Sequence, residues 1–202
     1  MIKAIIFDLG GVILTHKFEV TLISLAEIFK IEEDKFLDVF KKYEDSWVKG
    51  EISAKKFALK FKQEFKSNLS LGTILKCWKD IYQQRTQVNK ELISLIKKLR
   101  KKYKIYLLTN TTDLHHNMNM KRAIFHHFDK IFASFLVGMR KPNKDFYEHV
   151  LKKIKVKPQE CIFIDDRFEN IETAQKLNIN AILFEDNQKL VKDLKKFKVG
   201  LA

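Results

Sequence analysis

Polar residues of several chemical kinds follow short apolar runs at separate points of this chain. They are Asp8 after Ile2–Phe7, Thr109 and Asn110 after Ile105–Leu108, Lys141 soon after Ile131–Phe135, and Asp165 and Asp166 after Cys161–Ile164. A carboxylate can attack phosphorus and form an aspartyl-phosphate if cations offset its repulsion from the phosphate. Mg²⁺ held by carboxylates can offset it, while lysine and backbone N–H groups hold the other phosphate oxygens. The Gly10-Gly11 turn would let the backbone come close to that phosphate.

The apolar runs have the length and β-rich composition of strands that are buried on both faces. A fifth run, Ala181–Phe184, has the same character. Helical patterns separate the later runs, at 92–99, 143–153, 170–177 and 187–197. Strands that alternate with helices predict a parallel sheet in a doubly wound, Rossmann-like α/β fold. Ligands bind beyond the carboxyl ends of such strands, so we expect the polar residues above to converge at one sheet edge.

Residues 15–87 interrupt this alternation, because a simple strand-to-helix loop has about 2–6 residues. Apolar residues recur here at helical spacing in four series, around 22–29, 36–47, 54–65 and 71–82. Four amphipathic helices can bury their apolar faces against one another as a bundle, so we interpret the aromatic residues as bundle core. The expected division is a core domain of residues 1–14 and 88–202 and a helical cap domain of residues 15–87.

Composition excludes several classes of protein. The 202 residues include 46% apolar residues and 17 Phe, too many for a disordered chain. No apolar run reaches the roughly 18 residues that span a bilayer, and we find no secretion signal. Cys77 and Cys161 have no metal-type spacing. We therefore expect a cytoplasmic protein with no membrane partner, as a monomer or homodimer.

The formal net charge of +14 could indicate nucleic-acid binding. However, the lysines are spread over most predicted helices, which argues against nucleic acid as a functional partner. A positive field would also attract an anionic small molecule.

Four motifs in order resemble those of the haloacid dehalogenase superfamily of hydrolases. They are IIFDLGGVIL (Ile5–Leu14), YLLTN (Tyr106–Asn110), VGMRKPNKDFY (Val137–Tyr147) and FIDDRFENIETAQ (Phe163–Gln175). The resemblance covers nearly the whole chain and points to the subfamily with an α-helical cap inserted after the first strand. The sequence is similar to sugar-phosphate phosphatases and to the phosphatase domain of soluble epoxide hydrolases. This resemblance implies that the protein is a phosphatase that acts on a small phosphorylated metabolite such as a sugar phosphate.

The resemblance also implies roles at the phosphate. Asp8 would be the nucleophile, and Lys141 would neutralise both the nucleophile and the phosphate. Thr109 and Asn110 would bind the phosphate.

The remaining motif residues would form a magnesium site. Asp166 would ligate Mg²⁺ together with Asp8 and the backbone carbonyl of Gly10. Asp165 and Asn170 would support that site indirectly or through water.

Gly10 departs from the usual family pattern, in which an aspartate two residues after the nucleophile protonates the leaving group. Such an acid/base typically contributes ~10²–10⁴-fold. The substrate could have a good leaving group, such as an anomeric or acyl phosphate. Alternatively, another residue could substitute, such as His16 in the loop entering the cap, which we also expect at the substrate. A third possibility is a weak enzyme. His115 and His116 could also face the cleft.

Two other functions stay open. A 2-haloacid dehalogenase would use Asp8 to displace halide without a metal, and Asp166 argues against it. A catalytically weakened binding protein would retain the fold, and Gly10 motivates this alternative.

Overall fold

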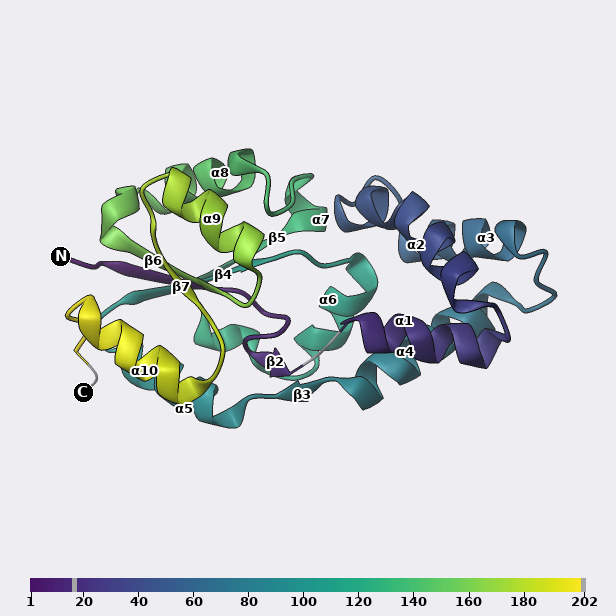
Figure 1. The fold of residues 1–202 in the computed structure, drawn as a ribbon, viewed down its shortest axis with the longest axis horizontal. Helices are drawn as coiled ribbons and strands as arrows, with labels where there is room; N and C mark the ends of the chain where they lie inside the picture. The colour runs from purple at the N-terminus through teal and green to yellow at the C-terminus, as the bar shows by residue number, and fades with distance from the viewer. Residues whose placement is uncertain (16–17, 201–202) are drawn as a thin grey trace.

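The computed structural model describes residues 1–15 and 18–200, which form an α/β fold around a five-stranded parallel sheet (Figure 1). The strands are β1 (Ala4–Phe7), β4 (Lys104–Thr109), β5 (Lys130–Ala133), β6 (Cys161–Asp165) and β7 (Asn180–Leu183). Their order is β5-β4-β1-β6-β7, so the first strand of the chain lies at the centre. This topology confirms the doubly wound α/β prediction.

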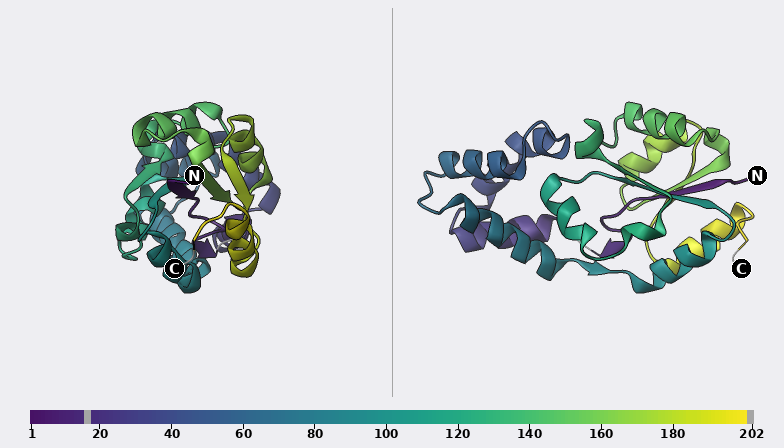
Figure 2. Two further views of the ribbon diagram at one scale, coloured as in Figure 1. Left: turned by 90° about the vertical axis from the view of Figure 1, so that its left-hand side faces the viewer. Right: turned by 180° about the vertical axis from the view of Figure 1, so that it is seen from behind.

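Successive side chains of each strand point to opposite faces of the sheet, and each face has its own apolar core. Ile5 and Phe7 of β1 belong to a cluster with α5 (Lys90–Leu99) and α10 (Asn187–Lys196). Ala4 and Ile6 belong to a second cluster with α8 (Lys144–Ile154) and α9 (Phe168–Lys176). Figures 1 and 2 show these two helix pairs on opposite sides of the sheet. Burial on both faces explains why β1 is apolar throughout.

Three predicted strands extend beyond the observed ones, because β1 begins only at Ala4, β7 ends at Leu183 and β5 ends before Phe135. The apolar run Ile131–Phe135 continues past the sheet, but β5 ends at Ala133, where its partner β4 ends at Thr109. Helix α7 (Ser134–Val137) begins at once, so Phe135 is helical. The Ser134 hydroxyl donates to the carbonyl oxygen of Thr111 and accepts from its N–H, both at 2.9 Å, which replaces the ladder hydrogen bonds.

Residues 18–85 form four helices: α1 (Phe18–Phe29), α2 (Glu33–Val48), α3 (Ala54–Glu64) and α4 (Leu71–Arg85). Ser53 and Ser70 cap α3 and α4 by accepting backbone N–H groups. The predicted aromatic series is confirmed as bundle core, and Trp47 stacks on Phe57 with ring centroids 4.1 Å apart. Leu114 of α6 (Asp113–Met120) belongs to the same cluster, so the bundle core extends into the α/β part.

The chain enters and leaves this insert through a short antiparallel ribbon of β2 (Leu14–Thr15) and β3 (Gln87–Val88). Both predicted domain boundaries fall within the ribbon. Further contacts join the insert to α6: the Trp47 Nε1–H donates to Asp113 at 2.8 Å, and the Asn119 amide donates to the Tyr82 hydroxyl at 2.9 Å. The insert is therefore anchored at more places than its two connections.

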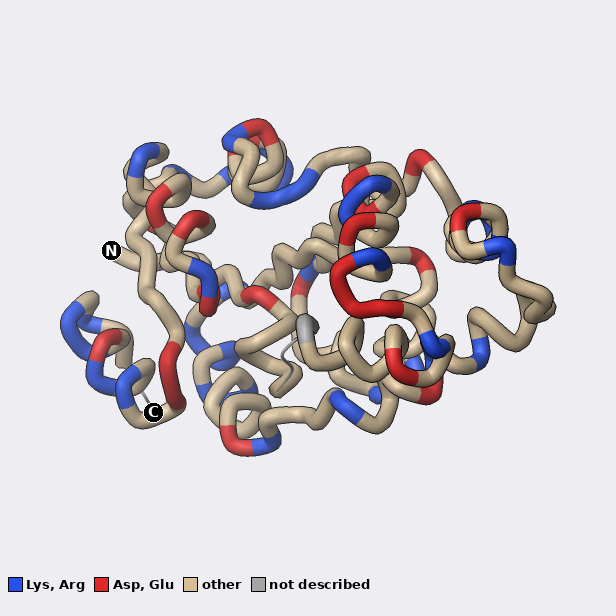
Figure 3. Tube along the Cα trace, turned by 45° about the vertical axis from the view of Figure 1, so that its right-hand side comes forward, with Lys and Arg blue, Asp and Glu red and all other residues tan. Residues whose placement is uncertain are grey.

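Lysines and arginines are distributed over the helices of both parts and are interspersed with acidic residues (Figure 3). In the ranges that the structure describes, no helix combines the length and apolarity needed to cross a membrane.

Candidate active site

A cleft of about 520 Å³ separates the carboxyl end of the sheet from the helical insert. The sequence-predicted residues that line it are Asp8, Gly10, Thr109, Asn110, Lys141, Asp166 and Asn170. They come from the ends of β1, β4 and β6, from the loop before α8 and from the first turn of α9. The structure therefore brings residues from distant sequence positions to one edge, where a parallel sheet positions its ligands.

Lys141 lies at the centre of the charged groups. Its Nζ atom is 2.7 Å from Asp8 Oδ1 and 2.6 Å from Asp165 Oδ2. Only 2% of this residue is exposed. Burial alone would lower the pKa of its ammonium group, but the Asp165 and Asp8 carboxylates outweigh that effect and raise it. Lys141 is thus a buried cation held against the side chain of Asp8.

Asp8 is a carboxylate in an unusual environment. Burial is the main cause that raises its pKa to about 7; Lys141 opposes the shift, and the negative charge of Asp165 adds to it. A further cation near Asp8 would favour the ionised form that a nucleophile needs.

The neighbouring aspartates Asp165 and Asp166 are arranged very differently. Asp165 is fully buried, and its oxygens accept from the Lys141 ammonium, the Arg167 N–H and the Asn170 amide. Asp166 is exposed. Ligand atoms of Asp8, Asp165 and Asp166 all lie within 4.8 Å of one another. Three carboxylates at this spacing are the oxygen donors that Mg²⁺ prefers, and Asp166 is less committed to protein contacts than Asp165.

The two glycines after Asp8 differ in what their positions allow. Gly11 has a φ of +78°, and a Cβ there would lie 2.0 Å from Asp166 Oδ2. A Cβ at Gly10 would meet nothing within 4 Å. Gly11 therefore makes room for the Asp166 carboxylate, while crowding at the Cβ does not explain the absence of an aspartate at position 10.

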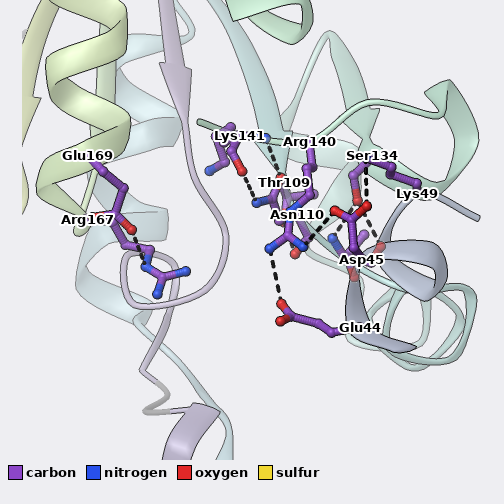
Figure 4. A network of polar contacts seen from close by, with 11 residues as sticks. Glu44, Asp45, Lys49, Thr109, Asn110, Ser134, Arg140, Lys141, Arg167 and Glu169 are labelled. Carbon is purple, nitrogen blue, oxygen red and sulfur yellow. Dashed lines mark hydrogen bonds and ion pairs between the residues drawn. The ribbon is translucent and has the colours of Figure 1, made fainter. Parts of the chain in front are cut away.

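Asn110 holds the loop that carries Lys141. Its side-chain amide donates to the Lys141 carbonyl, and its side-chain oxygen accepts from the Lys141 N–H, both at 2.8 Å (Figure 4). These two bonds orient the Asn110 side chain toward the backbone of Lys141. A phosphate contact from Asn110 is therefore better supplied by its backbone N–H. Thr109 is 2% exposed and lies beside it at the end of β4.

Among the histidines, His115 lines the cleft and its ring stacks on Tyr82 with centroids 4.1 Å apart. The His116 ring lies against Phe125 and Phe135, and burial lowers its pKa. His16 lies outside the described residues.

The sequence reasoning missed an ion pair across the cleft. Arg140, next to Lys141, contacts Glu44 at 3.1 Å and Asp45 at 3.2 Å, and both acids belong to α2 (Figure 4). The pair ties the insert to the Lys141 loop.

The sequence reasoning also missed the face of α2 that borders the cleft. It comprises Leu37, Phe40, Lys41, Glu44, Trp47 and Val48. Phe40 and Trp47 also belong to the bundle core, so helical spacing predicted the bundle face but not that its edge borders the cleft.

We compared the chain with models of known protein families. A family model described as haloacid dehalogenase-like hydrolase matches residues 2–178. The chain belongs to the haloacid dehalogenase-like hydrolases. This membership confirms the family that the four motifs indicated.

Relatives of this hydrolase span nearly its whole length. A sesquiterpene phosphatase from Aspergillus oryzae is 30% identical over 92% of this chain and 91% of its own. A D-ribitol-5-phosphate phosphatase from Bacteroides thetaiotaomicron is 25% identical over 90% of this chain and 91% of its own. A haloacid dehalogenase family enzyme from B. thetaiotaomicron, in complex with magnesium and inorganic phosphate, has a TM-score of 0.80 and 29% identity. That comparison covers 94% of this chain and 99% of the other.

Proposed function

We propose that this hydrolase is a Mg²⁺-dependent phosphatase that removes phosphate from a small phosphorylated metabolite through an aspartyl-phosphate on Asp8. The observation that carries the proposal is the buried Lys141 ammonium, which lies between Asp8 and Asp165 with Asp166 close by. This arrangement places cationic charge next to a carboxylate at the end of a strand, as attack on a phosphate anion requires.

The relatives support the reaction but differ in its substrate. One is named a sesquiterpene phosphatase and another a D-ribitol-5-phosphate phosphatase. The names share the removal of phosphate from a small organic molecule, so the comparisons favour that reaction without favouring one alcohol.

The donor set fits Mg²⁺. The carboxylates of Asp8 and Asp166 and the backbone carbonyl of Gly10 would hold the ion, and Asp165 and Asn170 would keep the surrounding loop in place. When bound, the ion would supply positive charge to the phosphate oxygens as a Lewis acid.

The residues of the chain would divide the chemistry in two steps. An Asp8 oxygen forms a bond to phosphorus while the bond from phosphorus to the alcohol oxygen breaks, and that oxygen takes a proton from solvent water. A water molecule then attacks phosphorus of the aspartyl-phosphate and gives up a proton to solvent, which releases phosphate and restores the Asp8 carboxylate. Lys141 and the backbone N–H of Asn110 would hold the phosphate oxygens throughout.

Gly10 and the helical insert would affect the reaction without contacting the reacting phosphorus atom. Gly10 has no group that can protonate the departing alcohol, so the rate should depend on the acidity of that alcohol. Residues 15–87 would act as the cap that closes over the substrate and excludes water, while residues 1–14 and 88–202 form the catalytic core.

Phosphate release from an aryl phosphate with Mg²⁺ and with EDTA tests the proposal. We expect release that EDTA abolishes and that Asp8→Asn lowers at least ~10³-fold. Asp38→Asn is a matched control, because Asp38 is exposed on α2 and does not line the cleft. Equal slow release by the wild type and Asp8→Asn would indicate a binding protein instead. Metal-independent chloride release from a 2-haloacid would indicate a dehalogenase.

A further inference from the structure

One face of α2 forms a wall of the cleft opposite the charged groups. It presents Leu37, Phe40, Trp47 and Val48 at helical spacing, and Leu22 of α1 lies beside them. All except Leu37 are nearly fully buried, and Leu22, Phe40 and Trp47 belong to the bundle core. Their positions are thus set by bundle packing before any substrate arrives.

The charged residues on this wall leave little polar surface for a substrate. Glu44 is paired with Arg140 across the cleft, and Arg140 also contacts Asp45. The Tyr82 hydroxyl accepts from Asn119. Lys41 is exposed on the same face of α2. Among the described residues of the insert, the polar groups at the cleft are therefore mostly committed to the protein itself.

This wall would receive the part of the substrate that leaves with the ester oxygen. A polyol would lose water from several hydroxyl groups there and would regain few hydrogen bonds, which costs free energy for each unpaired group. A hydrocarbon or aromatic group would instead gain from leaving water. A mostly apolar wall with a few polar groups at one end is also the usual form of a small-molecule site.

We infer that the alcohol part of the substrate is apolar, of hydrocarbon or aromatic character, and that it binds against the α2 face of the cleft. The inference rests on the proposed phosphatase function and narrows the sugar phosphate expected from the sequence. The phosphate end would lie at Asp8 and Lys141. The apolar end would extend along Phe40 toward Leu37.

A series of straight-chain alkyl phosphates tests the inference, together with a six-carbon polyol phosphate. We expect kcat/KM to rise about fourfold per methylene from ethyl to hexyl phosphate, which corresponds to about 0.8 kcal/mol per buried CH₂. We expect hexyl phosphate to exceed the polyol phosphate by at least ~10²-fold. The matching alkylphosphonates should show the same trend as competitive inhibitors.

A pair of leucine variants locates the effect on the enzyme. Leu37→Ser should lower the ratio of hexyl to ethyl phosphate turnover about tenfold, and Leu37→Met should retain the wild-type ratio. Leu59→Ser is the matched control, because Leu59 is an exposed leucine of α3 outside the cleft. Thermal melting checks that all three variants are folded.

These assays test the apolar-alcohol preference separately from the phosphatase activity. Phosphate release with a flat alkyl series, or with a preference for the polyol phosphate, would overturn the inference and leave the phosphatase intact. An unchanged ratio in Leu37→Ser would overturn the placement on α2. Absence of phosphate release from every ester would refute the proposed function itself.

Discussion

Replacing Gly11 by alanine should damage the proposed metal site far more than the fold. A Cβ at this position would lie 2.0 Å from Asp166 Oδ2. Real Cβ atoms almost never approach another heavy atom more closely than 3.0 Å. The Asp166 carboxylate must therefore shift by about 1 Å or more. Metal–ligand distances tolerate only about 0.2 Å, so a shift of this size removes Asp166 from productive coordination.

The cost to stability should be modest, because an Asp side chain can rotate. The main expense is the left-handed backbone of Gly11, about 1–2 kcal/mol for a residue with a Cβ. For a chain of this size that corresponds to a fall in melting temperature of roughly 2–8 °C. The Mg²⁺ concentration for half-maximal activity should rise by about 10–100-fold, the range seen when the support of a metal site is lost.

Gly138→Ala is the matched control. Gly138 has a φ of +76°, nearly that of Gly11, but a Cβ there would meet nothing within 4 Å. Both variants should lose similar stability without metal, and only Gly11→Ala should need more Mg²⁺. Melting curves in EDTA and a Mg²⁺ titration of phosphate release measure the two quantities. Equal Mg²⁺ requirements in the two variants would refute the assignment of Asp166 to the metal.

Three further predictions concern the nucleophile and its neighbours. Gly10→Asp should speed turnover of alkyl phosphates more than that of aryl phosphates, because only poor leaving groups need the added acid. Equal effects on the two classes of ester in paired assays would contradict a role of the new aspartate as the acid. Folding raises the pKa of Asp8 from 3.8 to about 7. The contribution of Asp8 to the free energy of unfolding is therefore fully present below about pH 4 and is lost as the pH rises through 7. Asp8→Asn should accordingly melt above the wild type in EDTA at pH 8, with a gap that narrows toward pH 4; a constant gap would count against the buried-acid explanation. Arg140→Gln and Glu44→Gln should each raise KM about two- to fivefold. The double variant should be no worse than Arg140→Gln, because both changes break the Arg140–Glu44 pair and only Arg140→Gln also breaks the contact with Asp45; additive effects in a double-mutant cycle would show that they act separately.

The class of fold and the approximate location of the site could be predicted from the amino-acid sequence. Apolar runs at strand length, separated by helical patterns, were sufficient for the parallel sheet, and the polar residues at their ends marked one edge. These patterns are local, because residues within one strand or helix repeat at the period of that element. For the same reason the four helices between residues 18 and 85 could be predicted from apolar spacing alone.

The contacts that each functional residue makes could not be predicted from the sequence and became clear in the folded chain. Asp165 and Asp166 are adjacent and chemically identical, yet one is fully engaged with Lys141, Arg167 and Asn170 while the other is exposed. Their difference arises because β6 ends at Asp165, which the protein buries, while Asp166 lies just beyond the strand and borders the cleft.

Contacts between distant segments were equally beyond the sequence pattern. The pairing of Arg140 with Glu44 and the face that α2 turns to the cleft depend on how the insert packs on α6 and α7. Periodicity shows which residues share a helix face, but the neighbour that each face meets is set by packing across the whole chain. The proposed reaction could therefore be inferred from strand ends, whereas the proposed preference for an apolar alcohol required the folded cleft.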